Sequence, residues 1–125
     1  LFLGGLDDRI GCAICVGMMT TWRDLVLQKC GNHTWMMWVP GLPRHLDYPE
    51  ILALRVPQPT MVLNNDEDPL FSLSEMHRAD DIVRQVYDKA GAGGRYACSF
   101  YPGTHKFDAA MQEEAFAWFD RWLKA

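Results

Sequence analysis

The sequence predicts an α/β protein with a mostly parallel sheet flanked by helices, and three observations lead to this fold class. Short apolar runs typical of buried strands alternate with amphipathic stretches typical of helices. Most of the expected helices begin or end at residues that cap helices. Hydrophobic residues make up 49% of the 125 residues, which is enough apolar material for one small core. We therefore expect one domain, residues 1–125, in which helices connect parallel strands.

The first part of the chain predicts a strand, a helix and a long excursion. Residues 11–17 form a small apolar run bounded by glycines, typical of a strand buried on both faces. Residues 20–30 place apolar side chains among polar ones as a short helix does, and Gly31 ends this expected helix. Residues 31–46 are dense in Trp, Met, Pro and Gly without a clean period, and we expect a lid-like excursion there.

The second part predicts a brief helix followed by two strand–helix pairs. Residues 47–50 read Asp-Tyr-Pro-Glu, which is a capped helix start, and residues 72–75 carry a second capping-box pattern. Strands are expected over 60–64 and 96–101, and Gly91 ends the helix between them. A final helix carries one apolar stripe, formed by Met111, Ala115, Trp118, Phe119, Trp122 and Leu123.

The beginning of the sequence indicates a piece of a longer protein. Residues 1–6 are apolar, have no initiator Met and no basic leader, and do not resemble a signal peptide. A sheet of three strands is small for this architecture, and its first strand would be an unusually apolar edge. We therefore expect the second half of a larger sheet, and we expect the chain alone to aggregate partly or to dimerise through that edge.

Charge and hydropathy exclude two classes of partner. The net charge is −4, so the chain offers no basic excess for a nucleic acid or an anionic membrane. No segment approaches the roughly 18 consecutive apolar residues of a membrane span. We expect neither a nucleic-acid nor a membrane partner.

Two of the four cysteines have the C-x-x-C spacing that zinc and redox sites use. Cys12 and Cys15 lie in the first apolar strand, where alternation directs side chains three positions apart to opposite faces. No second C-x-x-C or histidine pair follows at ligand spacing. We expect buried, reduced thiols, no metal and no cofactor, which favours a reducing compartment such as the cytoplasm.

An acid-rich loop and a histidine loop follow two neighbouring strands. Residues 64–71 read Asn-Asn-Asp-Glu-Asp-Pro-Leu-Phe, and residues 101–107 read Tyr-Pro-Gly-Thr-His-Lys-Phe. Catalytic groups gather where the carboxyl ends of parallel strands meet their loops, so an acid of the first loop can meet His105. Such a pair forms two thirds of a nucleophile–base–acid triad. The remaining histidines are expected to be structural or exposed: His33, His45 and His77.

These loops resemble the acid and histidine loops of α/β-hydrolases. The resemblance is carried by Asp-Pro-Leu-Phe at 68–71 after an apolar strand and by Gly-Thr-His-Lys-Phe at 103–107 before an aromatic helix. It is closest to the esterase branch with acetyl xylan esterase-like and dienelactone hydrolase-like proteins. Residues 6–10 and 17–22 also resemble the segment after the nucleophile elbow of that branch. The resemblance therefore covers essentially the whole chain.

The resemblance implies the C-terminal half of an α/β-hydrolase fold and a carboxylic-ester hydrolase that acts on a small-molecule ester. It implies Asp68 as the triad acid and His105 as the base, with Asp66 in the same turn as the alternative acid. The full-length protein would use a serine-type acyl-enzyme mechanism.

The nucleophile of that family is missing from this sequence. The motif G-x-S-x-G does not occur, and the three serines lie at expected helix caps or in a strand. Residues 1–6 would then be the rest of the helix after the elbow, and the oxyanion hole would be missing as well. Cys15 is an alternative nucleophile, since dienelactone hydrolases use cysteine in a similar elbow, although residues 17–21 are a poor helix start. An inactive truncated hydrolase and a non-catalytic α/β module are further alternatives.

Methionine and tryptophan side chains gather after the first strand and in the excursion. Such clusters usually belong to a core, but substrate pockets of hydrolases are built in these places. The candidate substrate-binding residues are Met18, Trp22 and Trp38.

Overall fold

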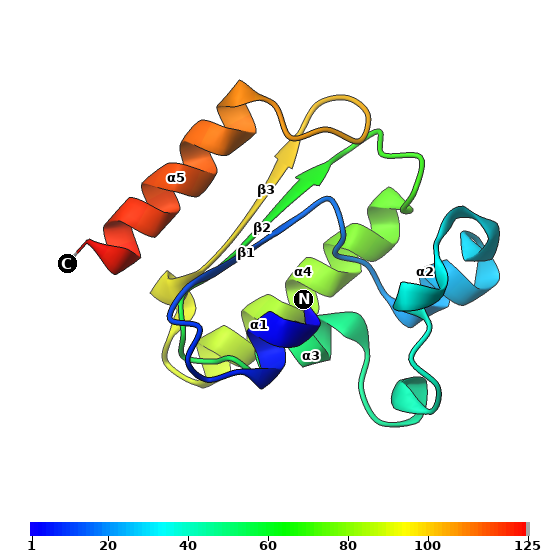
Figure 1. The fold of residues 1–125 in the computed structure, drawn as a ribbon, viewed down its shortest axis with the longest axis horizontal. Coiled ribbons are helices and arrows are strands. Elements are labelled where there is room, and N and C mark those ends of the chain that lie inside the picture. The colour runs from blue at the N-terminus through cyan, green and yellow to red at the C-terminus, as the bar shows by residue number, and fades with distance from the viewer. Residues whose placement is uncertain (125) are drawn as a thin grey trace.

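The computed structural model describes residues 1–124 and shows a parallel sheet with helices on both faces (Figure 1). The strands are β1 (Ala13–Val16), β2 (Thr60–Asn65) and β3 (Tyr96–Tyr101), and they lie side by side in that order. All three are parallel, so their carboxyl ends lie at one edge of the sheet. The parallel α/β class predicted from the sequence is confirmed.

The central strand β2 separates two cores. Val62 packs into a large cluster with residues of α2 (Trp22–Leu27), α3 (Tyr48–Ala53) and α4 (Leu73–Lys89). Met61 and Leu63 point to the opposite face, where α5 (Ala109–Leu123) covers them. Every residue of β2 is buried, because β2 has a neighbour on both sides and helices on both faces.

The edge strand β1 differs from its prediction. Of its four residues only Cys15 is buried, because one side of β1 has no neighbouring strand among the described residues. A short helix, α1 (Phe2–Leu6), precedes β1, and its leucines Leu3 and Leu6 are exposed. β1 thus packs against a core on each face, with Cys15 on one and Ile14 and Val16 on the other, but its open edge leaves it less buried than the sequence predicts.

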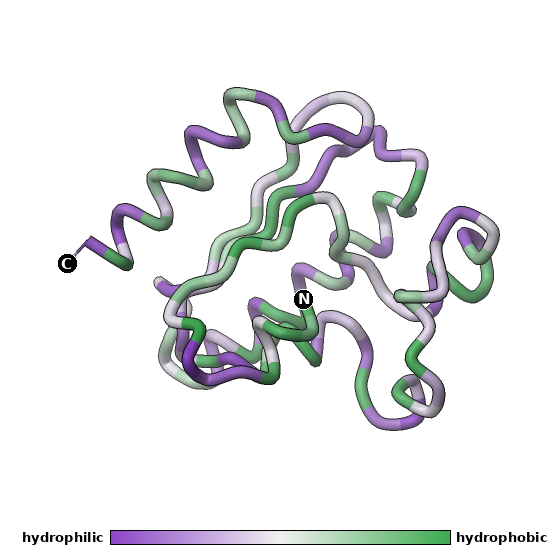
Figure 2. Tube along the Cα trace, viewed as in Figure 1, coloured by the Kyte–Doolittle hydropathy of each residue, from purple (hydrophilic) through white to green (hydrophobic). Residues whose placement is uncertain are grey.

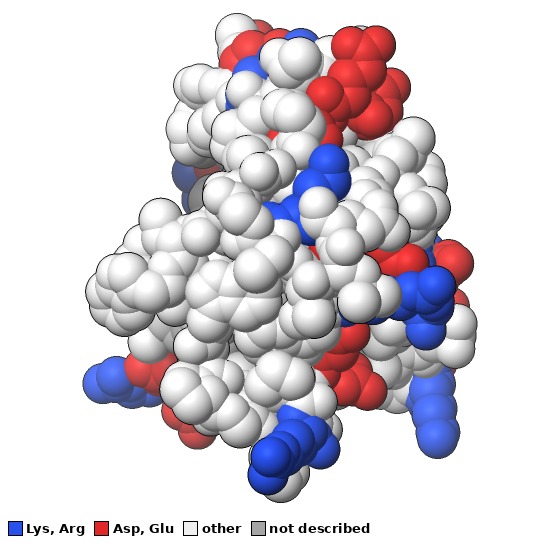
Figure 3. Space-filling model, turned by 90° about the vertical axis from the view of Figure 1, so that its right-hand side faces the viewer, with Lys and Arg blue, Asp and Glu red and all other residues white. Residues whose placement is uncertain are grey.

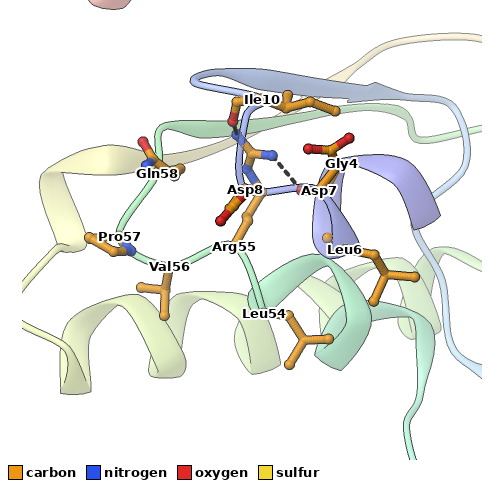
Figure 4. Close-up of a pocket in the computed structure, with 11 residues that line it drawn as sticks. Gly4, Leu6, Asp7, Asp8, Ile10, Leu54, Arg55, Val56, Pro57 and Gln58 are labelled. Atoms are coloured by element: carbon orange, nitrogen blue, oxygen red, sulfur yellow. Dashed lines mark hydrogen bonds between the residues drawn. The ribbon is translucent and has the colours of Figure 1, made fainter.

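A buried arginine, Arg55, lies at the amino-terminal end of the sheet, where it bonds several chain segments (Figure 4). The Arg55 guanidinium donates to the carbonyl oxygens of Gly4 at 2.7 Å and Ile10 at 3.1 Å, and to Thr60 Oγ1 at 2.6 Å. It lines a hollow of about 200 Å³. Desolvation by burial lowers the pKa of Arg55, yet the charge is held by neutral oxygens only. Arg55 thus ties the beginning of the chain to the turn before β2.

Residues 31–46, where an excursion is expected, are built of short turns. With Cys30 they contain three short 3-10 turns, at Cys30–Asn32, Trp35–Met37 and Leu42–Arg44. A fourth such turn, Gly93–Arg95, precedes β3. Figure 3 shows the face that carries α2 and this segment, where uncharged side chains cover most of the surface. No helix among residues 1–124 combines the length and apolarity that a membrane crossing needs.

Candidate active site

Asp68 and His105 meet at the carboxyl ends of β2 and β3. Asp68 Oδ2 lies 2.7 Å from His105 Nδ1, although the residues are 37 positions apart. The Asp68 side chain is fully buried, whereas the His105 side chain is 49% exposed. An ionised carboxylate only accepts hydrogen bonds, so Nδ1 carries the proton and Nε2 of the neutral ring is left as an acceptor. The pair predicted from the two loops is therefore formed.

The second carboxylate oxygen of Asp68 is also bonded. Asp68 Oδ1 accepts a hydrogen bond from the backbone N–H of Leu70 at 2.9 Å. The Asp68 N–H donates to the carbonyl of Asn65 at 3.3 Å, which closes a turn directly after β2. Both oxygens of the buried carboxylate thus have donors, and the orientation of the side chain is fixed from two directions.

The histidine loop is held by the residues that precede Asp68. Asp66 Oδ1 accepts from the N–H of Gly103 at 3.0 Å, and the Glu67 N–H donates to the Gly103 carbonyl at 3.1 Å. The buried Asn65 accepts from the N–H of Lys106 at 3.2 Å. Asp66, the alternative acid, therefore bonds the backbone of the histidine loop and not the imidazole of His105.

Asn65 is a site residue that the sequence reasoning missed. Its side chain is completely buried and also reaches Met111 Sδ of α5, at 3.5 Å from Nδ2. The signal was present, because two consecutive asparagines at the end of an apolar strand need buried polar partners. Figure 2 shows this change from hydrophobic to hydrophilic residues where β2 ends.

The end of β1 reaches the same site through Gly17. Gly17 has a φ of +57° and donates its N–H to the Leu63 carbonyl at 2.8 Å. A Cβ at this position would lie 2.8 Å from Cε1 of His105. Met18 follows directly and lies against Cys15, with 3.8 Å between the two sulfur atoms. Of the three candidate substrate-binding residues, Met18 is therefore the one that follows the glycine facing His105.

The other two candidate substrate-binding residues, Trp22 and Trp38, lie beside α2. Trp22 is buried and stacks on Tyr48 with ring centroids 4.6 Å apart, and its centroid lies 5.5 Å from that of Trp38. Both tryptophans line an open apolar hollow of about 310 Å³ beside α2, together with Pro40 and Pro43. Trp22 is thus a core residue whose ring also borders a surface hollow.

The cysteines lie where strand alternation predicts. Cys12 belongs to the core under α5 and Cys15 to the core under α4, so the two thiols face opposite sides of the sheet. Burial raises the pKa of Cys15 to about 11, which keeps the thiol protonated at neutral pH and opposes its use as a nucleophile. Among residues 1–124 no group of three or more His, Cys, Asp or Glu side chains could hold a metal ion.

The parallel sheet, its flanking helices and the order of its loops define part of an α/β-hydrolase fold. No family model and no curated protein matches the chain. Among solved structures, a carbohydrate esterase family 15 glucuronoyl esterase from Caldicellulosiruptor kristjansonii matches with a TM-score of 0.74 and 15% identity, over 97% of this chain. The glucuronoyl esterase catalytic domain from Hypocrea jecorina matches over 98% with a TM-score of 0.69 and 18% identity.

A promiscuous esterase of the same family, from a marine bacterial metagenome, matches over 98% of the chain with a TM-score of 0.73 and 16% identity. This chain covers 39%, 40% and 38% of these three structures, in the order given. The chain is therefore similar in fold to about two fifths of these esterases, which confirms the partial α/β-hydrolase fold predicted from the sequence.

Proposed function

We propose that this chain supplies the acid and the base of a carboxylic-ester hydrolase whose nucleophile lies outside the 125 residues. The observation that carries the proposal is the contact between the buried Asp68 carboxylate and Nδ1 of His105. It leaves Nε2 of a half-exposed imidazole as a proton acceptor at the carboxyl end of the sheet. The similarity in fold to esterases supports the same reaction class.

The proposed mechanism assigns one task to each residue. His105 Nε2 takes the proton from a serine hydroxyl as its oxygen attacks the ester carbonyl, and then gives that proton to the leaving alcohol. Water then attacks the acyl-enzyme carbonyl while His105 takes its proton, and His105 gives that proton to the serine oxygen as the acyl group leaves as the acid. Asp68 holds the imidazole in the correct tautomer and stabilises its protonated form.

The names of the structural neighbours suggest a narrower substrate class. Several are glucuronoyl esterases, and one was solved with methyl 4-O-methyl-β-D-glucopyranuronate. We therefore propose an ester of a carbohydrate carboxylic acid as the substrate. Met18, which follows Gly17 at the end of β1, is the candidate contact nearer the reacting group, and the hollow at Trp22 and Trp38 is a candidate for more distant parts of such a substrate.

The test uses the protein made from the longest reading frame that contains this chain. Hydrolysis of an aryl acetate and of methyl glucuronate is measured for the wild type and for His105→Gln, Asp68→Asn and Asp66→Asn. Loss of the triad acid lowers kcat by about 10⁴-fold and loss of the triad histidine by about 10⁶-fold, and we expect losses of this size for Asp68→Asn and His105→Gln respectively. Asp66→Asn keeps an acceptor oxygen for Gly103 and should retain most activity. Full turnover by His105→Gln would refute the proposed function.

A further inference from the structure

The backbone of the acid loop is held by side chains from α2 and the turn after it. Lys29 Nζ donates to the Pro69 carbonyl at 2.9 Å. The N–H of Ser72 donates to Asp24 Oδ2 at 2.9 Å, and Asp24 is completely buried. These contacts join segments about 40 to 48 residues apart in the sequence, so the acid loop is bonded on its outer side as well as to the histidine loop.

A third side chain, His33, also bonds the backbone of the acid loop, at the residue that itself bonds Asp68. Its Nε2 lies 3.0 Å from the Leu70 carbonyl oxygen, which only accepts, so Nε2 is the donor. Its ring also stacks on the buried Phe71, with centroids 4.9 Å apart. The N–H of the same Leu70 donates to Asp68 Oδ1 at 2.9 Å. Leu70 is thus bonded to His33 through its carbonyl and to the catalytic acid through its amide.

We propose that His33 is a positioning residue, which acts through Leu70 to hold the Asp68 carboxylate against His105. The inference rests on the proposed function, because it concerns the same acid and base. His33 lies at the beginning of residues 31–46, so it links this segment, which also carries Trp38, to the acid. A movement of the segment that breaks the His33 contact frees the Leu70 carbonyl, and the freed backbone of Leu70 then holds its N–H less firmly against the Asp68 carboxylate.

The experiment follows the Nδ1 proton of His105 by nitrogen-edited NMR, which reports the bond to Asp68 without requiring turnover. His33→Phe keeps an aromatic ring over Phe71 and removes the donor. We expect the His105 Nδ1 proton to exchange with water about fivefold faster, the factor that corresponds to one hydrogen bond. His33→Gln places an amide donor within reach of the Leu70 carbonyl and should restore slow exchange.

His45→Phe is the matched control, since His45 is an exposed histidine of the same segment. It should leave the His105 signal unchanged. Unchanged exchange in His33→Phe, equal acceleration in His45→Phe, or no rescue by His33→Gln would each overturn the inference. Asp68→Asn separates this failure from failure of the proposed function. If the His105 proton is insensitive to Asp68→Asn, the acid–base pair itself is refuted, whatever the result at His33.

Discussion

At Gly17 the backbone of the edge strand passes beside the imidazole that we propose as the base. Two physical constraints coincide there, because φ is +57° and a Cβ would lie 2.8 Å from His105 Cε1. An L-residue in this conformation costs about 1–2 kcal/mol. The ring would also have to move away from the strand end, which would strain its bond to Asp68.

Gly17→Ala should therefore lower the free energy of unfolding by about 1–2 kcal/mol and shift the NMR signals of the His105 ring. Gly41→Ala is the matched control, since Gly41 also has a positive φ of 82° but has no atom within 4 Å of its Cβ position. It should lose a similar free energy of unfolding, measured by urea titration, and leave His105 unchanged. Identical His105 spectra for the two variants would contradict the steric argument.

At the residue scale the sequence predicts Asp68 and His105 because each belongs to a motif that follows a strand. The motif at 68–71 favours Asp68, but Asp66 stays an alternative because both acids occupy one turn. In the structure Asp66 accepts from the Gly103 N–H and Asp68 bonds the imidazole. Asn65 and His33 escape prediction for a related reason. Their partners, Lys106 and Leu70, are backbone groups 41 and 37 residues away, which no local pattern encodes.

At the scale of elements, two similar capping patterns have different outcomes. Asp47 and Glu50 form the predicted capping box at the start of α3. At α4 the prediction is wrong, because Ser72 makes no side-chain cap and Glu75 accepts a hydrogen bond from Thr21 Oγ1 at 2.6 Å instead. The helix exists in both cases, since the apolar periodicity that buries its face does not depend on the cap.

This difference predicts unequal effects of removing the two cap residues. Asp47 Oδ1 accepts from the N–H groups of Tyr48 and Trp22, so Asp47→Ala should lower the free energy of unfolding by about 1–2 kcal/mol. Ser72→Ala loses only an exposed bond to Gln28 and should cost roughly 0.5 kcal/mol or less. Urea unfolding at neutral pH measures both. Equal losses would show that Ser72 caps α4 in solution.

At the scale of the whole molecule, β1 is an edge strand whose outer side has no neighbouring strand among residues 1–124, and β3 forms the opposite edge. Ala13 donates its N–H to the carbonyl of Pro59, directly before β2, and Gly17 donates to Leu63 of β2. By strand alternation the N–H groups of Ile14 and Val16 therefore point away from the sheet. The exposed leucines of α1 lie in the segment that leads into β1. The structural neighbours are more than twice as long as this chain, and in a longer protein a further strand can cover the edge.

The 125-residue chain on its own should therefore associate through β1, as such edges pair readily with a second strand. We expect the apparent mass in analytical ultracentrifugation to rise with concentration. Ile14→Pro removes an outward-facing donor without touching a bond to β2 and should shift the chain toward the monomer. Ile14→Val keeps the donor and should associate like the wild type, with circular dichroism confirming that both variants are folded. A concentration-independent monomer would show instead that the four-residue edge is too short to recruit a second copy.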